Sequence, residues 1–137
     1  MKHELDALIR KLDQRQIVDW IPEMKLGRPA YDHIRAAVES GTLTTNQLRN
    51  GLHALFRLRD HASWQEVFDI FVRLAGHEHE EVRTEAVKLA VGSVRFHKHY
   101  PLKPLTASGQ DIAALRRALD MGVEPRIAEL AKEVLAL

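Results

Sequence analysis

Hydrophobic side chains recur three and four positions apart through most of the chain, with charged side chains between them. Leu5, Leu8 and Leu12 show this spacing and predict an amphipathic helix over 3–13. A second apolar cluster follows over 17–24. Within it, Pro22 is expected to end or kink a helix, because proline lacks a donor N–H and clashes with the preceding turn.

Polar residues, glycine and proline divide the remaining pattern into further helices. The segment 25–29 (KLGRP) reads as a loop, after which Pro29 suits the first turn of a helix. Thr44 with Gln47, and Ser63 with Glu66, have the spacing of capping boxes, and Ser108 with Asp111 starts a later helix. These signals predict helices over 30–39, 44–59, 63–76, 80–96 and 108–122, and a last one from Pro125 onward.

Gly51 lies in the interior of the predicted 44–59 helix. A glycine at such a position costs about 1 kcal/mol of stability relative to alanine. We therefore expect another helix to pack closely against the backbone at Gly51.

Two of these helix pairs carry the same apolar pattern at a fixed offset of 45 residues. A weaker copy lies upstream at an offset of 34, where Arg49 falls opposite Arg83. Helix pairs that repeat at a fixed period indicate a solenoid of stacked hairpins, in which each pair buries a face on its neighbour. The pairs matched at the offset of 45 are Val82–Ile127, Ala86–Ala131, Leu89–Val134, Val67–Ile112, Ile70–Leu115 and Leu74–Leu119.

The segment Glu81-Val82-Arg83, followed by Ala86 and Leu89, resembles the second helix of a HEAT repeat. The resemblance implies a short, right-handed, all-α solenoid in a single domain over 1–137. Its N-terminal cap would be 1–29, and 97–107 would be a loop between repeats. The helical hairpins would be 30–59, 63–96 and 108–137, although in the last one Arg126 precedes the aliphatic residue instead of following it.

The resemblance also carries broad functional expectations. HEAT-type repeats mostly hold protein–protein contacts, some bind nucleic acid, and a minority act on DNA bases or bilin cofactors. At the position of Arg83 the family commonly has an arginine that pairs between adjacent repeats. We therefore expect Arg83 to have a structural role.

Composition excludes several classes of function. The 20 Lys and Arg nearly balance the 19 Asp and Glu, and no segment forms a charged tail for nucleic acid or membrane. Without cysteine, disulfides, thiolate catalysis and cysteine-based zinc sites are excluded. Residues 1–13 lack the apolar core of a signal peptide, and no uncharged apolar run approaches the roughly 18 residues of a membrane span. We expect a soluble, cytoplasmic protein.

Histidine pairs at 77/79 and 97/99 raise the possibility of a metal site. They lie at opposite ends of the predicted 80–96 helix, about 25 Å apart at 1.5 Å per residue, so one metal ion cannot bridge them. A pH-sensitive contact stays possible. Ser63 and Ser108 are better explained as helix caps than as nucleophiles. The sequence therefore predicts no catalytic residue, no metal and no cofactor.

In a HEAT-like stack the second helices line the concave face, and we expect their basic side chains, together with the 97–107 loop, to form the binding surface. A tyrosine on such a loop is suited to anchoring an interface. We hypothesise stoichiometric binding of a protein partner, as an adaptor, a regulator or a toxin-neutralising immunity protein. A nucleic-acid binder using the same basic stripe, and an enzyme or metal protein using the histidines, are the alternatives. The candidate contact residues are Arg49, His53, Arg57, Lys88, Arg95, His97, Lys98, His99 and Tyr100.

Overall fold

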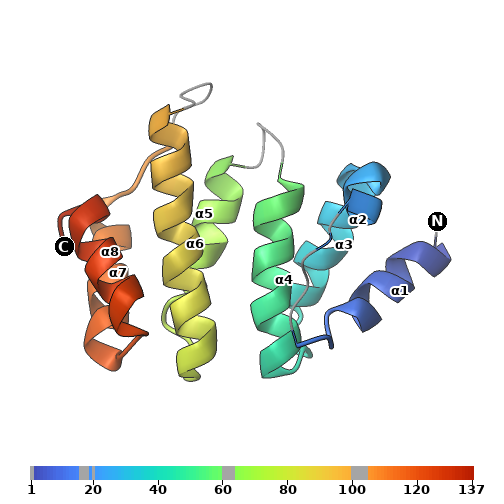
Figure 1. Ribbon diagram of the computed structural model, residues 1–137, viewed down its shortest axis with the longest axis horizontal. Coiled ribbons are helices and arrows are strands. Elements are labelled where there is room, and N and C mark those ends of the chain that lie inside the picture. The colour runs from blue at the N-terminus through green and yellow to red at the C-terminus, as the bar shows by residue number, and fades with distance from the viewer. Residues whose placement is uncertain (1, 16–18, 20, 60–63, 100–104) are drawn as a thin grey trace. The chain divides into compact units, whose positions relative to one another are not determined.

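The computed structural model describes residues 2–15, 19, 21–59, 64–99 and 105–137, and all regular secondary structure in these residues is α-helical (Figure 1). The all-α prediction is therefore confirmed. The chain divides into two compact units, Met1–Arg59 and Asp60–Leu137. Each has its own set of buried apolar side chains. The expectation of a single domain over 1–137 stays a prediction.

The first unit contains helices α1 (Lys2–Lys11), α2 (Ile21–Leu26), α3 (Arg28–Glu39) and α4 (Thr45–Leu58). Helices α3 and α4 form the main pair, and α1 and α2 pack on α3. Apolar residues at helical spacing meet between them, as the sequence pattern predicts. The largest fully buried side chains here are Leu12, Tyr31, Ile34, Leu52 and Leu55.

Two predictions about the first unit are wrong. Pro22 is the second residue of α2, so it starts a helix instead of ending one, because the first turn needs no N–H from that residue. The predicted loop over 25–29 is also absent, since Gly27 alone separates α2 from α3. Gly27 has a φ of +69°, which a residue without a side chain adopts freely. Pro29 lies in the first turn of α3, as expected.

Capping boxes start two helices where the sequence predicts them. At α4 the Thr44 hydroxyl accepts from the Gln47 N–H at 3.2 Å, and the Gln47 side chain accepts from the Thr44 N–H at 2.9 Å. Ser108 and Asp111 make the equivalent pair of hydrogen bonds at the start of α7. Each box supplies acceptors for N–H groups that a helix leaves without an internal partner. The third predicted cap, Ser63, lies outside the described residues.

The second unit contains α5 (Trp64–Leu74), α6 (Glu80–His99), α7 (Gly109–Met121) and α8 (Pro125–Leu135). Helix α6 contacts both α5 and α8, and α5 also contacts α7 (Figure 1). The predicted stripe of Val82, Ala86 and Leu89 on α6 is buried. Helices α5 and α7 begin 45 residues apart, and so do α6 and α8.

The predicted loop over 97–107 is wrong at its beginning, because α6 continues through His99. Proline restricts the residue immediately before it, so Pro101 does not prevent residues 97–99 from being helical. Residues 100–104 lie outside the described part of the chain. Beyond them, the Gln65 side chain on α5 makes two hydrogen bonds to the backbone of Thr106, at 3.0 and 2.7 Å, and fixes the approach to α7.

Gly51 lies where α4 meets α3, as its position in the helix predicts. A Cβ built on Gly51 would lie 2.9 Å from Val38 Cγ2, closer than carbon atoms pack. The branched side chain of Val38 has few alternative rotamers with which to move away. The close contact between the two helices therefore leaves room for glycine at this position but not for a larger residue.

We predict that Gly51→Ala lowers the free energy of unfolding by about 1–3 kcal/mol, although alanine is the better helix former. Chemical denaturation measures the change. Adding Val38→Ala should restore part of the loss, because it removes the atom that the new methyl group meets. A Gly51→Ala protein that is as stable as the wild type would show that the two helices do not touch here.

Candidate functional site

Asparagine side chains on α4 point at the carbonyl oxygens that follow α1. Asn50 Nδ2 donates to the Leu12 carbonyl at 2.9 Å and to that of Gln14 at 2.6 Å. Asn46 Nδ2 donates to the carbonyls of Asp13 at 2.9 Å and Gln14 at 3.0 Å. The carbonyls of Ile9, Arg10 and Lys11, at the end of α1, accept the backbone N–H groups of residues 12–14. The α4 side chains therefore supply donors to the turn that follows α1.

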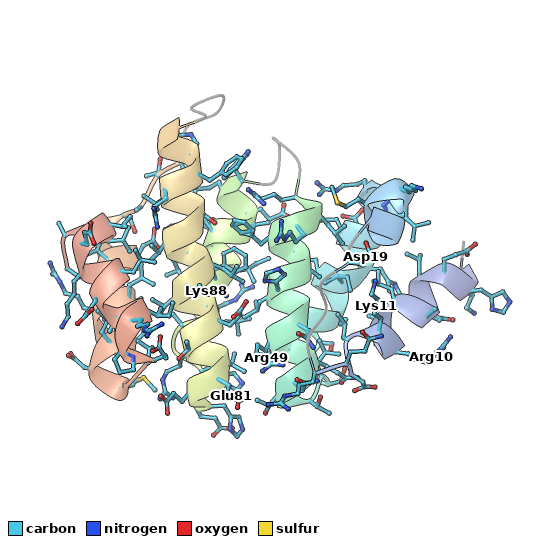
Figure 2. The ribbon with its side chains drawn as sticks, viewed as in Figure 1. Arg10, Lys11, Asp19, Arg49, Glu81 and Lys88 are labelled. Atoms are coloured by element: carbon cyan, nitrogen blue, oxygen red, sulfur yellow. The ribbon has the colours of Figure 1, made fainter. Side chains whose placement is uncertain are left out.

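Arg49 belongs to the same arrangement (Figure 2). Its Nη2 atom donates to the Arg15 carbonyl at 2.5 Å and to Asn46 Oδ1 at 2.6 Å. Arg49, which the sequence predicts to contact a partner, thus makes its hydrogen bonds within the first unit. Asn46 and Asn50 are not among the residues predicted from the sequence. Their signal was two asparagines four residues apart inside a helix, where asparagine is unfavourable unless its side chain bonds elsewhere.

His53 and Arg57 continue the face of α4 that carries Arg49, at steps of four residues. Arg57 Nε donates to His53 Nε2 at 3.3 Å, and the Arg57 side chain is exposed. The structure thus brings Arg49, His53 and Arg57 onto one side of one helix. Of the three, Arg57 is exposed, whereas Arg49 and His53 are half-buried.

Lys88 and Arg95 share the exposed side of α6 in the second unit. Lys88 is 49% exposed and lies 3.8 Å from the carboxylate of Glu85. Glu81, one turn before Glu85, is also exposed, and Figure 2 shows Glu81 and Lys88 on α6. This side of α6 therefore carries both signs of charge, acidic toward the start of the helix and basic toward its end.

Aromatic side chains gather near the end of α6. The Phe96 ring stacks on Trp64 with ring centroids 5.1 Å apart, and His97 meets Trp64 edge-on at 6.0 Å. Trp64 is buried, whereas Phe96 is 42% exposed. The His97 Nε2 atom is buried and makes no hydrogen bond within the described residues. Lys98 and His99 are helical, but their side chains, and the whole of Tyr100, lie outside what the structure describes.

Arg83 is buried at 7% exposure and joins two interhelical turns of the second unit. Its Nη1 atom donates to the carbonyls of His77 at 3.1 Å and Glu78 at 2.7 Å, in the turn before α6. Its Nε and Nη2 atoms donate to the carbonyls of Gly122 at 3.0 Å and Met121 at 3.4 Å, at the end of α7. These contacts account for the structural role expected of Arg83.

His77 lies in the turn before α6 that Arg83 contacts. Its Nδ1 atom accepts the N–H of His79 at 3.1 Å. Burial, together with the nearby His79 and Arg83, lowers the pKa of His77, while Glu78 acts in the opposite direction. The folded chain therefore binds this proton more weakly than the unfolded chain does. Stability contributed by the turn is present above the ordinary histidine pKa and is lost as the pH falls below it.

No group of three or more histidine, aspartate and glutamate side chains gathers closely enough, within the part of the chain that is described, to hold a metal ion. The pairs at 77/79 and 97/99 flank opposite ends of α6. Among the described residues, no helix is both long and apolar enough to cross a membrane.

Comparisons with protein-family models, with curated proteins and with solved structures find no match for this chain. The function is therefore inferred from the side chains themselves. They form one group on α4 of the first unit, where Arg49 bonds the segment after α1, and one on α6 of the second unit, where Lys88, Arg95 and Phe96 are exposed.

We predict that Arg83→Met lowers the free energy of unfolding by about 2–4 kcal/mol, because it keeps an apolar stem but removes the donors to four carbonyls. Denaturation monitored by circular dichroism measures this change. Arg116→Met, an exposed position on α7, is the matched control and should change stability by less than about 0.5 kcal/mol. Equal stabilities of the two variants would contradict the role given to Arg83.

Proposed function

We propose that the chain is a non-enzymatic helical-repeat protein that binds a protein partner stoichiometrically through the exposed face of α6. The observation that carries this proposal is Phe96, a large aromatic ring 42% exposed beside the exposed Arg95 and seated on the buried Trp64. Aromatic and arginine side chains are enriched among the residues that dominate protein interfaces. An adaptor, a regulator and an immunity protein all fit this mode of action.

The charges on α6 favour a protein partner over nucleic acid. Lys88 is paired with Glu85, and Glu81 extends the acidic part of the same side of the helix. Phosphates along a nucleic-acid backbone would gain from Lys88 and Arg95 but be repelled by the two glutamates. A protein surface of mixed charge can complement both the acidic and the basic end of this side of α6. Such complementarity would fix the orientation of the partner on the helix.

Contacts seen within each unit support the proposal of HEAT-like stacking. The helices of the second unit start at the offset of 45 residues that the apolar pattern follows. Arg49 and Arg83, which align at the offset of 34, both donate to backbone carbonyls beyond a neighbouring helix, at Arg15 after α1 and at Gly122 after α7. A recurring arginine with one recurring task is expected of a repeat architecture. We also propose that the partner is met in the cytoplasm.

The proposal is tested by affinity purification from the source cell, followed by binding of the purified partner. We expect a partner retained at a stoichiometric ratio by the wild type and lost when Arg95→Glu is combined with Phe96→Ser. The chain has two tryptophans, Trp20 and Trp64. In a Trp20→Phe background, docking on Phe96 should also change the fluorescence of Trp64, because the two rings are stacked.

The matched control is Arg116→Glu, the same charge reversal at an exposed position of α7. It should retain the partner. Undiminished binding by the Arg95→Glu/Phe96→Ser protein would overturn the α6 site. Duplex DNA bound by the wild type and lost in this variant would favour the nucleic-acid alternative.

A further inference from the structure

Helix α8 carries a self-complementary pattern on its exposed side. Arg126, Leu130 and Glu133 follow one another at steps of four and three residues, so they form one line along the helix. Arg126 and Glu133 are exposed, and Leu130 between them is half-buried. A basic group, an apolar group and an acidic group thus lie in sequence along this side of α8.

Apolar side chains bordering this line are less covered than their counterparts on α6. Ile127 and Val134 on α8 are half-buried, whereas Val82 and Leu89, 45 residues earlier, are almost completely buried. Stacked hairpins bury such positions on a neighbouring hairpin. The α8 surface keeps apolar side chains at these positions, which leaves area for another surface to cover.

We propose that this surface is a homodimer interface, in which the α8 helices of two copies cross antiparallel at Leu130. With a rise of 1.5 Å per residue, Arg126 lies about 6 Å to one side of Leu130 and Glu133 about 4.5 Å to the other. Reversing the second helix therefore places its Glu133 against Arg126, and its Arg126 against Glu133. The two leucines meet at the centre.

The order of the charges identifies a second copy as the occupant. A two-fold interface requires that residue i contacts residue j of the partner while j contacts i, and Arg126 and Glu133 satisfy this with opposite charges. Exposed ion pairs contribute little each, about 0.2–1 kcal/mol. A single pair of short helices also buries less than the roughly 1,200 Å² of a standard stable interface. The dimer is therefore weak and depends on protein concentration.

Sedimentation of the full chain over a concentration series tests the interface. Arg126→Glu and Glu133→Arg each turn both attractive pairs into repulsive ones, and each should weaken self-association by about tenfold or more. An equimolar mixture of the two variants should form heterodimers, because every pair across that interface is again attractive. The double variant, with the charges exchanged, should self-associate as the wild type does. Arg117→Glu on α7, also exposed, should leave association unchanged.

A wild type that stays monomeric up to its solubility limit would overturn the proposal. So would a dimer that both single variants retain, since its interface would lie elsewhere. Failure of Arg126→Glu to fold is detected by circular dichroism, and the test then rests on Glu133→Arg, which should self-associate less than the wild type, with Arg117→Glu as its control. This interface uses α8 and is independent of the partner site proposed on α6.

Discussion

Backbone carbonyls in the turns between helices need hydrogen-bond donors, and side chains of neighbouring helices supply them in both units of the chain. In the first unit the carbonyls after α1 are met by Asn46, Asn50 and Arg49 of α4. In the second, those at the end of α7 and in the turn before α6 are met by Arg83. A buried carbonyl without a donor costs about 1–3 kcal/mol, so these side chains stabilise the turns that follow α1 and α7 against the neighbouring helices.

This constraint separates the polar residues that hold the fold from those that remain for binding. Arginine on a second helix is ambiguous in sequence, because the same residue type serves phosphates, carboxylates and backbone carbonyls. Arg49 and Arg83 are engaged inside their own units. Arg95 projects from α6 into solvent beside Phe96, which makes α6 the helix on which a partner site is proposed.

Local signals in the sequence predicted much of the fold. What was missed comprises helix boundaries near Pro22, Gly27 and Pro101, and side-chain contacts between helices. The capping boxes at Thr44 and Ser108 depend on residues three apart, so the sequence alone reveals them. Gly51 was predicted from the cost of glycine in a helix. Asn50 was missed because its partners lie more than 30 residues away in the chain. The extension of α6 was missed because Pro101 was given a wider influence than its own neighbour. For the candidate site, sequence identified the exposed Lys88 and Arg95 but not the exposed Phe96, whose stacking on Trp64 is a tertiary contact.

Hydrogen exchange of the intact protein tests most directly whether side chains of α4 hold α1. Asn50→Asp keeps the shape of the side chain but sets a carboxylate against two carbonyl oxygens. The backbone amides of α1 should then exchange about tenfold faster or more, while α3 and α4 keep their protection. Gln110→Glu, the same change at an exposed position of α7, should leave α1 as it is. Unchanged exchange of α1 in the Asn50→Asp protein would contradict the account.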